Sequence, residues 1–269
     1  MDSDDKKITQ LARATSLSDS DLFVVVVNIG TAPATKAIAK SDLGVSGRTL
    51  AIAGCELIWN SATSLSLGTG LCIAENGDEI DIISPLTASS LSLSNSTFHH
   101  VYAYLSGGSP AMEVVTTAPV AWKGTAYSKT GDTSRRYIGS VLTDGSGNVR
   151  RFKHDPITNT ILYVNAAITS APYRVLSDQK ATSATSVSMT GIVPVTVTYA
   201  LVRMTNLDTT YAAYVGVATL TTSAYDESIG TGVRIFRSIA LESQATYYIY
   251  AGAPADGLYI DVPGYIYKR

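Results

Sequence analysis

Short apolar segments alternate with turn-forming residues along residues 51–155 of the chain. The separators are clusters of Gly, Asn, Asp, Ser and Pro, which tight turns favour. This spacing is typical of an antiparallel β-sandwich or barrel, and no stretch shows helical periodicity beyond three turns. The predicted strands are Leu50–Ile58, Ser64–Leu67, Glu79–Ile83, Val101–Leu105, Met112–Thr116, Tyr137–Leu142 and Val149–Phe152.

A second β unit is predicted for residues 156–269, after a boundary at Asp155-Pro156. Val195–Met204 is apolar or threonine on both faces, so we expect it to be a central strand. From the pattern alone, we expect a β-sandwich or jelly-roll-like head. The other predicted strands are Ile161–Val164, Tyr211–Ala218, Val233–Ile239, Thr246–Tyr250, Leu258–Val262 and Tyr265–Tyr267.

Residues 1–50 differ from the rest of the chain. The β-branched run Leu22–Val27 predicts a strand, and Thr35–Ala39 predicts a second, shorter strand after a turn around Asn28–Pro33. A unit this small cannot build a core of its own, so we expect it to dock on another surface. The whole sequence therefore predicts an all-β protein with an N-terminal segment and two antiparallel β modules.

Charged residues make up only 16% of the 269 residues, against roughly 25% in an ordinary globular protein. The net charge of −2 excludes a protein that binds nucleic acid mainly through bulk charge. The start, Met1–Lys7, is too polar for a signal peptide, and runs such as Phe23–Val27 are far shorter than the ~20 residues that span a bilayer. We expect no nucleic-acid partner, no membrane insertion and synthesis in a reducing compartment.

Two cysteines, Cys55 and Cys72, are too few for a disulfide scaffold or a four-thiolate metal site. Whether they pair stays open at this point. Free cysteines more often behave as small buried apolar side chains, and that interpretation is the favoured one.

Catalytic chemistry finds little support in the sequence. His99 and His100 are adjacent in a predicted strand, so their side chains point to opposite faces and cannot share a site. The motifs of a nucleophile elbow, a phosphate-binding loop and a dinucleotide-binding fold are missing. The acidic residues around Asn76-Gly77 favour a solvated hairpin turn over a Ca²⁺ site. We predict that the protein is not an enzyme and uses no metal or cofactor.

Two stretches resemble segments of bacteriophage tail fibres and related virion fibre proteins. The first, Ile8–Val25 with Ala34–Leu43, combines an apolar-Thr-x-Leu start, a Ser-Asp-x-Asp turn, an apolar strand and a Thr-Lys-x-Ile strand ending in Asp-Leu. The second is Phe98–Leu105 with Thr130–Ser140 and Asp144–Phe152, and it is similar to a β module of phage structural proteins. Residues 156–269 carry no such resemblance.

The resemblance implies a homotrimeric virion protein, made in the cytoplasm of a host bacterium. Residues 1–50 would attach it to other virion proteins of the tail, collar or head. Residues 51–155 would form a shaft or collar, and residues 156–269 would face outward for adhesion to a host-surface glycan or protein. The residues assigned to virion attachment are Ile8, Leu11, Leu17, Leu22, Val24, Val26, Ile38 and Leu43.

Tyrosines crowd the last part of the sequence, and they are candidates for a receptor or subunit interface because tyrosine supplies a large, rigid contact area. They are Tyr247, Tyr248, Tyr250, Tyr265 and Tyr267. Alternation predicts Tyr248 and Tyr250 on one face of a strand and Tyr247 on the other.

Two alternatives stay open beside the adhesive fibre. One is a head decoration or a head–tail collar fibre with purely structural contacts. The other is a glycan-cleaving tailspike fragment with a site between subunits, which requires two carboxylates across a groove.

Overall fold

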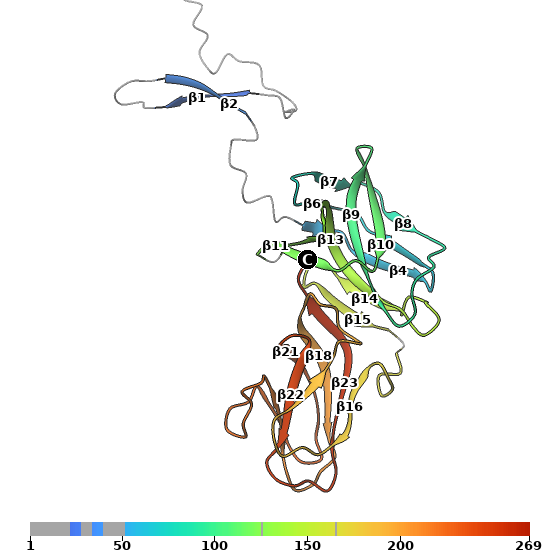
Figure 1. The fold of residues 1–269 in the computed structure, drawn as a ribbon, viewed down its shortest axis with the longest axis vertical. Helices are drawn as coiled ribbons and strands as arrows, with labels where there is room; N and C mark the ends of the chain where they lie inside the picture. Colours follow the sequence, from blue (N-terminus) through green and yellow to red (C-terminus); the bar gives the residue numbers. More distant parts are fainter. Residues whose placement is uncertain (1–21, 28–33, 40–51, 125, 165) are drawn as a thin grey trace, which may run out of the picture. The chain divides into compact units, whose positions relative to one another are not determined.

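The computed structural model describes residues 22–27, 34–39, 52–124, 126–164 and 166–269. Contacts divide the chain into two compact units, residues 1–49 and residues 50–269, and each is described by itself. Every regular element among the described residues is a strand, and no helix occurs there (Figure 1). The all-β prediction is therefore confirmed.

The described part of the first unit is one antiparallel hairpin. Strand β1 (Leu22–Val27) pairs with β2 (Ala34–Ala39), with Leu22 opposite Ala39 and Val27 opposite Ala34. Both strands fall where the sequence predicts them, because β-branched residues favour the extended backbone. Four of the expected attachment residues lie in this hairpin, namely Leu22, Val24, Val26 and Ile38. The other four lie outside the described residues, namely Ile8, Leu11, Leu17 and Leu43.

The second unit begins with three antiparallel sheets that share one hydrophobic core. The largest has the order β10 (Ser109–Val115), β9 (Phe98–Ser106), β13 (Asp132–Leu142), β12 (Ala126–Lys129) and β11 (Pro119–Lys123). The two smaller sheets are β3 (Ile52–Gly54), β6 (Gly70–Ile73) and β7 (Glu79–Ile82), and β4 (Leu57–Ser61), β5 (Ser64–Leu67) and β8 (Leu86–Ala88).

Two further antiparallel sheets follow and form a sandwich-like arrangement. One has the order β14 (Phe152–Asp155), β15 (Thr160–Tyr163), β23 (Leu258–Tyr267), β18 (Val197–Asn206) and β21 (Arg234–Ala240), and β16 (Arg174–Gln179) also pairs with β23. The other has the order β17 (Thr185–Ser188), β22 (Ala245–Tyr250), β19 (Ala213–Gly216) and β20 (Glu227–Ile229). Strand β18 is central, as the sequence predicts for Val195–Met204.

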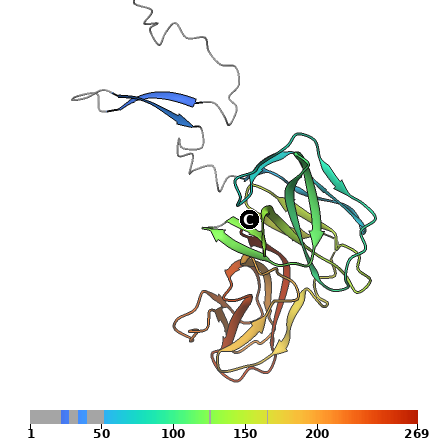
Figure 2. The same cartoon turned by 45° about the horizontal axis from the view of Figure 1, so that its top comes forward.

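Within residues 50–269, the strands of residues 52–142 gather in one part and those of residues 174–267 in another (Figure 2). The boundary expected at Asp155-Pro156 lies in the turn of the β14–β15 hairpin, whose strands pair from Phe152↔Tyr163 to Asp155↔Thr160. Strand β23 belongs to the sheet of the second part, yet its Tyr265 and Tyr267 hydroxyls bond to backbone of β13 in the first part. The two parts therefore share their interior.

The pairing of β23 with its neighbours β15 and β18 can be tested at Gly264. This glycine lies opposite Leu162 and Leu201 on the two neighbouring strands, and an added Cβ would collide with the carbonyl oxygen of Ile161. Because the colliding atom is backbone inside a sheet, Gly264→Ala should lower the free energy of unfolding by about 2 kcal/mol or more, measured by urea unfolding. Gly145→Ala is the control, because its Cβ would meet no atom. Equal stability of the two variants would contradict the pairing.

Candidate functional site

The five tyrosines expected at an interface occupy two environments. Tyr248 and Tyr250 of β22 are buried on one face and Tyr247 is half-buried on the other, as alternation predicts. Tyr265 and Tyr267 of β23 are buried as well. Four of the five therefore fill the interior of this chain and offer no exposed surface, and the interface interpretation is corrected for them.

Tyr265 and Tyr267 belong to a polar network where the two parts of residues 50–269 meet. The Tyr267 hydroxyl donates to the carbonyl oxygen of Ile138 at 2.9 Å, and the Tyr265 hydroxyl donates to that of Ser140 at 2.9 Å. From the first part, the Tyr137 hydroxyl reaches Thr196 Oγ1 at 2.8 Å. Each buried hydroxyl thus has a partner across the junction, which such groups need when they leave water.

His154 lies in this network and is neutral. Its Nδ1 accepts the backbone N–H of Leu57 at 2.8 Å, so its proton is on Nε2, which lies 3.0 Å from the Tyr267 hydroxyl. Burial, and then the nearby Arg269 guanidinium, lower the pKa of His154 to about 3. Burial, and then His99, lower the pKa of His100 to about 4. Both imidazoles are buried inside the chain.

Arg269 fastens the end of β23 to the first part. Its guanidinium donates to backbone carbonyl oxygens of Gly54, Cys55 and Pro156, and to Asn159 Oδ1. Four hydrogen bonds from one side chain satisfy most of its donors, which is required because Arg269 is buried.

Cys55 and Cys72 are both buried and both free thiols, in agreement with the favoured sequence interpretation. Hydrogen bonding from Cys72 lowers the pKa of Cys55, against the effect of burial. The same bond, and then burial, raise the pKa of Cys72. Neither thiol is accessible from solvent.

The acidic turns act as structural caps. Asp144 accepts the backbone N–H groups of Ser146 and Asn148, and Asp78 accepts from the Asn76 side chain. Within the ranges that the structure describes, no three His, Cys, Asp or Glu side chains are placed to hold a metal ion. Nor do those ranges include a helix that is long and apolar enough to cross a membrane.

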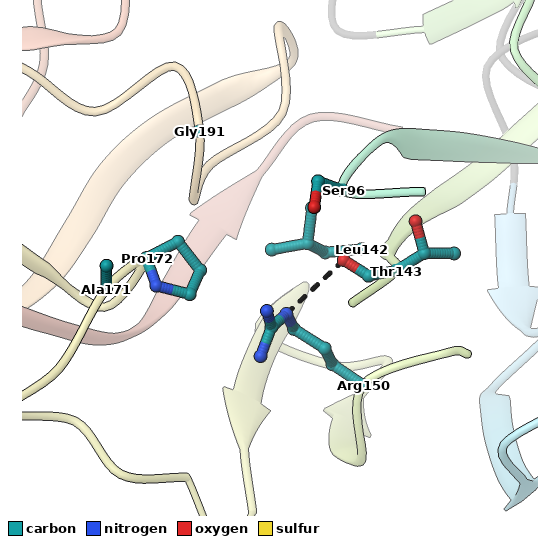
Figure 3. A pocket seen from close by; sticks show the side chains of 7 residues that line it. All are labelled: Ser96, Leu142, Thr143, Arg150, Ala171, Pro172 and Gly191. Carbon is teal, nitrogen blue, oxygen red and sulfur yellow. Dashed lines mark hydrogen bonds between the residues drawn. The ribbon is translucent and has the colours of Figure 1, made fainter. Parts of the chain in front are cut away.

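An open pocket of about 280 Å³ lies between loops of the two parts of residues 50–269 (Figure 3). The first part supplies Arg150 and the residues around Thr143, and the second supplies Pro172 and Gly191. The guanidinium end of Arg150 points toward the space between the Pro172 ring and Leu142 (Figure 3). The full lining is Ser96, Leu142, Thr143, Arg150, Ala171, Pro172 and Gly191.

The Arg150 side chain makes two hydrogen bonds, both long and both to neutral acceptors. Its Nε donates to the Thr143 carbonyl oxygen at 3.3 Å, and its Nη1 donates to the Tyr173 hydroxyl at 3.3 Å. The Tyr173 ring lies 5.3 Å from the guanidinium carbon. Among the described residues, no carboxylate forms an ion pair with Arg150. The pocket therefore offers a positive charge with donors to spare.

A second exposed feature is the side of the β14–β21 sheet that faces solvent. Cross-strand neighbours share a face, so the register groups five apolar residues on this side. Phe236 is 59% exposed, Tyr199 45% and Leu162 43%. We call this surface the outer face and define it by Leu162, Tyr199, Leu201, Phe236 and Ile266.

Two arginines beside the outer face are paired with one carboxylate. Asp261, which is fully buried, accepts from Arg174 Nε at 2.7 Å and from Arg203 Nε at 2.9 Å. The Arg174 guanidinium also lies over the Tyr259 ring, 4.8 Å from its centre. One carboxylate thus holds two guanidinium groups and reduces the charge of the surface around the apolar residues.

Sequence reasoning missed both exposed features. The Arg150 pocket is lined by residues from separated loops, and none of them belongs to a ligand-binding motif. The outer face had a weak signal, since Tyr199, Leu201 and Arg203 alternate with buried residues along β18. No protein-family model matches the chain, and no match is found among the curated proteins or the solved structures.

The buried histidines predict acid sensitivity. A histidine with a pKa below its unfolded value of about 6.5 stabilises the fold fully above that pH, and the stabilisation is lost as pH falls toward the folded pKa. Between pH 7 and pH 5, His154 and His100 should each remove about 2 kcal/mol from the free energy of unfolding. Urea unfolding at a series of pH values checks this. A flat profile over that range would contradict neutral, buried imidazoles.

Proposed function

We propose that the protein is a bacteriophage virion structural protein: a homotrimeric tail fibre or fibre-like appendage that attaches through its N-terminal segment and presents its C-terminal β part for host adhesion. The observation that carries the proposal is the N-terminal hairpin β1–β2, which belongs to a compact unit of its own, residues 1–49. The sequence resemblance to virion fibre proteins falls on the same segment and gives independent support.

A two-stranded hairpin is marginally stable in water unless its apolar side chains are covered. The run Leu22–Val27 consists only of apolar residues, so this hairpin needs a covering surface. Sister copies of the chain or other virion proteins would supply it. An attachment segment has this property, because it reaches full stability only at its docking site.

The outer face supports association between copies. This surface exposes three large apolar side chains, Phe236, Tyr199 and Leu162. A contiguous group of exposed apolar side chains is typical of a protein–protein contact. Subunit interfaces are depleted in unpaired charge, and Asp261 pairs Arg174 and Arg203 beside this surface. Three copies would also present three adhesive sites together, which binds a repetitive surface far more strongly than one site does.

The first test measures the mass of the full chain and of a variant that begins at Leu50. Light scattering should give three times the chain mass of 28.4 kDa for the full protein. The shorter variant should stay folded and oligomeric but fail to join phage particles that lack the protein. Incorporation of the shorter variant would contradict attachment through the hairpin, and a monomeric full chain would contradict the trimer.

The second test removes apolar area from the outer face. The double variant Tyr199→Ser, Phe236→Ser should shift the oligomer to the chain mass at micromolar concentration, because burying these side chains favours association. Ile157→Ser is the matched control, since Ile157 is 90% exposed in the β14–β15 turn and is not one of the residues that define this face. An unchanged mass for the double variant would place the interface elsewhere.

A further inference from the structure

We propose that the Arg150 pocket is a binding site for a small organic carboxylate. The pocket joins three properties that such a site needs: a concave volume of about 280 Å³, a cation with unused donors, and apolar walls for the body of the ligand. None of these depends on the N-terminal segment or on the oligomeric state.

The Arg150 guanidinium has N–H donors that a ligand can use. A guanidinium carries five N–H donors in a planar fork, and Arg150 uses one on Nε and one on Nη1. Nη2 and the second Nη1 proton have no acceptor among the described residues. Planar carboxylates match this fork with two parallel hydrogen bonds, which makes the contact strong and directional.

The acidic residue of the turn that precedes Arg150 does not fill this role. The Asp144 carboxylate accepts hydrogen bonds from the backbone N–H groups of Ser146 and Asn148 and from the Asn148 side chain. These hydrogen bonds lower the pKa of Asp144, and the charge of Arg150 contributes less than they do. Asp144 therefore remains in its own turn, and the Arg150 charge stays open to the pocket.

Size and lining restrict the ligand class. A volume of about 280 Å³ is at the lower end for small-molecule pockets, so it suits a molecule of roughly one sugar ring rather than a polymer segment. The Pro172 ring and Leu142 give apolar walls, and Ser96 adds a hydroxyl. With one cation and no second lysine or arginine in the lining, a monovalent carboxylate fits the charge better than a phosphate dianion.

Arg150 is held ready for this contact by its surroundings. Its own backbone N–H bonds to the Leu142 carbonyl oxygen at 2.8 Å, and its side chain is braced by the Thr143 carbonyl group and the Tyr173 ring. The cation therefore loses little side-chain freedom when a ligand binds, which favours affinity.

The experiment titrates the full-length protein with four probes: D-glucuronate, D-glucose, acetate and inorganic phosphate. Binding is followed by the side-chain Nε–H resonance of Arg150 in ¹⁵N-labelled protein, assigned by its loss in Arg150→Gln. Glucuronate should shift this resonance, and glucose, which has the same ring without the carboxylate, should not. Acetate, which has the carboxylate but no ring to contact the apolar walls, should shift the resonance more weakly than glucuronate does.

Two variants and one control complete the test. Arg150→Gln should weaken glucuronate binding about 10-fold or more, as expected for a lost charged hydrogen-bond pair. Gly191→Phe adds a large side chain to the lining and should abolish binding, and the fold should tolerate it because a Cβ at Gly191 meets open space. Arg151→Gln is the control: Arg151 lies over the Trp59 ring, outside the lining, and its loss should leave affinity unchanged.

The proposal is overturned if glucuronate gives no shift at millimolar concentration, if glucose binds as well as glucuronate, or if phosphate binds more tightly than both. Full glucuronate affinity in Gly191→Phe would also overturn it. Urea unfolding of each variant separates a lost site from a lost fold, and Gly191→Phe serves where Arg150→Gln is unstable.

Discussion

The hydroxyl groups of Tyr265 and Tyr267 hold the two β parts of residues 50–269 together. Both side chains leave a strand of the second part and bond to main-chain carbonyl groups of the first. Their strand, β23, is also paired on both sides within its own sheet. Separating the two parts would break these hydrogen bonds and expose their shared apolar interior to water, which is unfavourable.

The exposed features depend on this junction. Loops carrying Thr143 and Arg150 belong to one part, and those carrying Pro172 and Gly191 belong to the other. Because β23 fixes the two parts, the walls of the Arg150 pocket keep their separation before any ligand arrives. The outer face is exposed to solvent, since the core covers the opposite side of its sheet. Rigid elements thus position both surfaces that are available for contacts.

Local patterns in the sequence predicted the strands well, because alternation and turn residues act within a few positions. The run Val195–Met204 became the central strand β18, and Asn76-Gly77 lies in the turn between β6 and β7. No local pattern in the sequence indicates which distant strands and side chains come into contact. A tyrosine that bonds to a backbone carbonyl group far away looks, in sequence, like a tyrosine at an interface. Asp155-Pro156 has turn chemistry that suits a hairpin and a domain linker equally.

The position of β23 has a consequence for how the chain acquires its structure. Tyr265 bonds to a residue 125 positions earlier, and Tyr267 to one 129 positions earlier. During synthesis, the strand around Ser140 leaves the ribosome long before β23 has been made. Until then, the interior of the first β part lacks Tyr265 and Tyr267. Contacts between such distant residues slow folding and make it a single late event. Chaperone protection of the nascent chain would matter most in that interval.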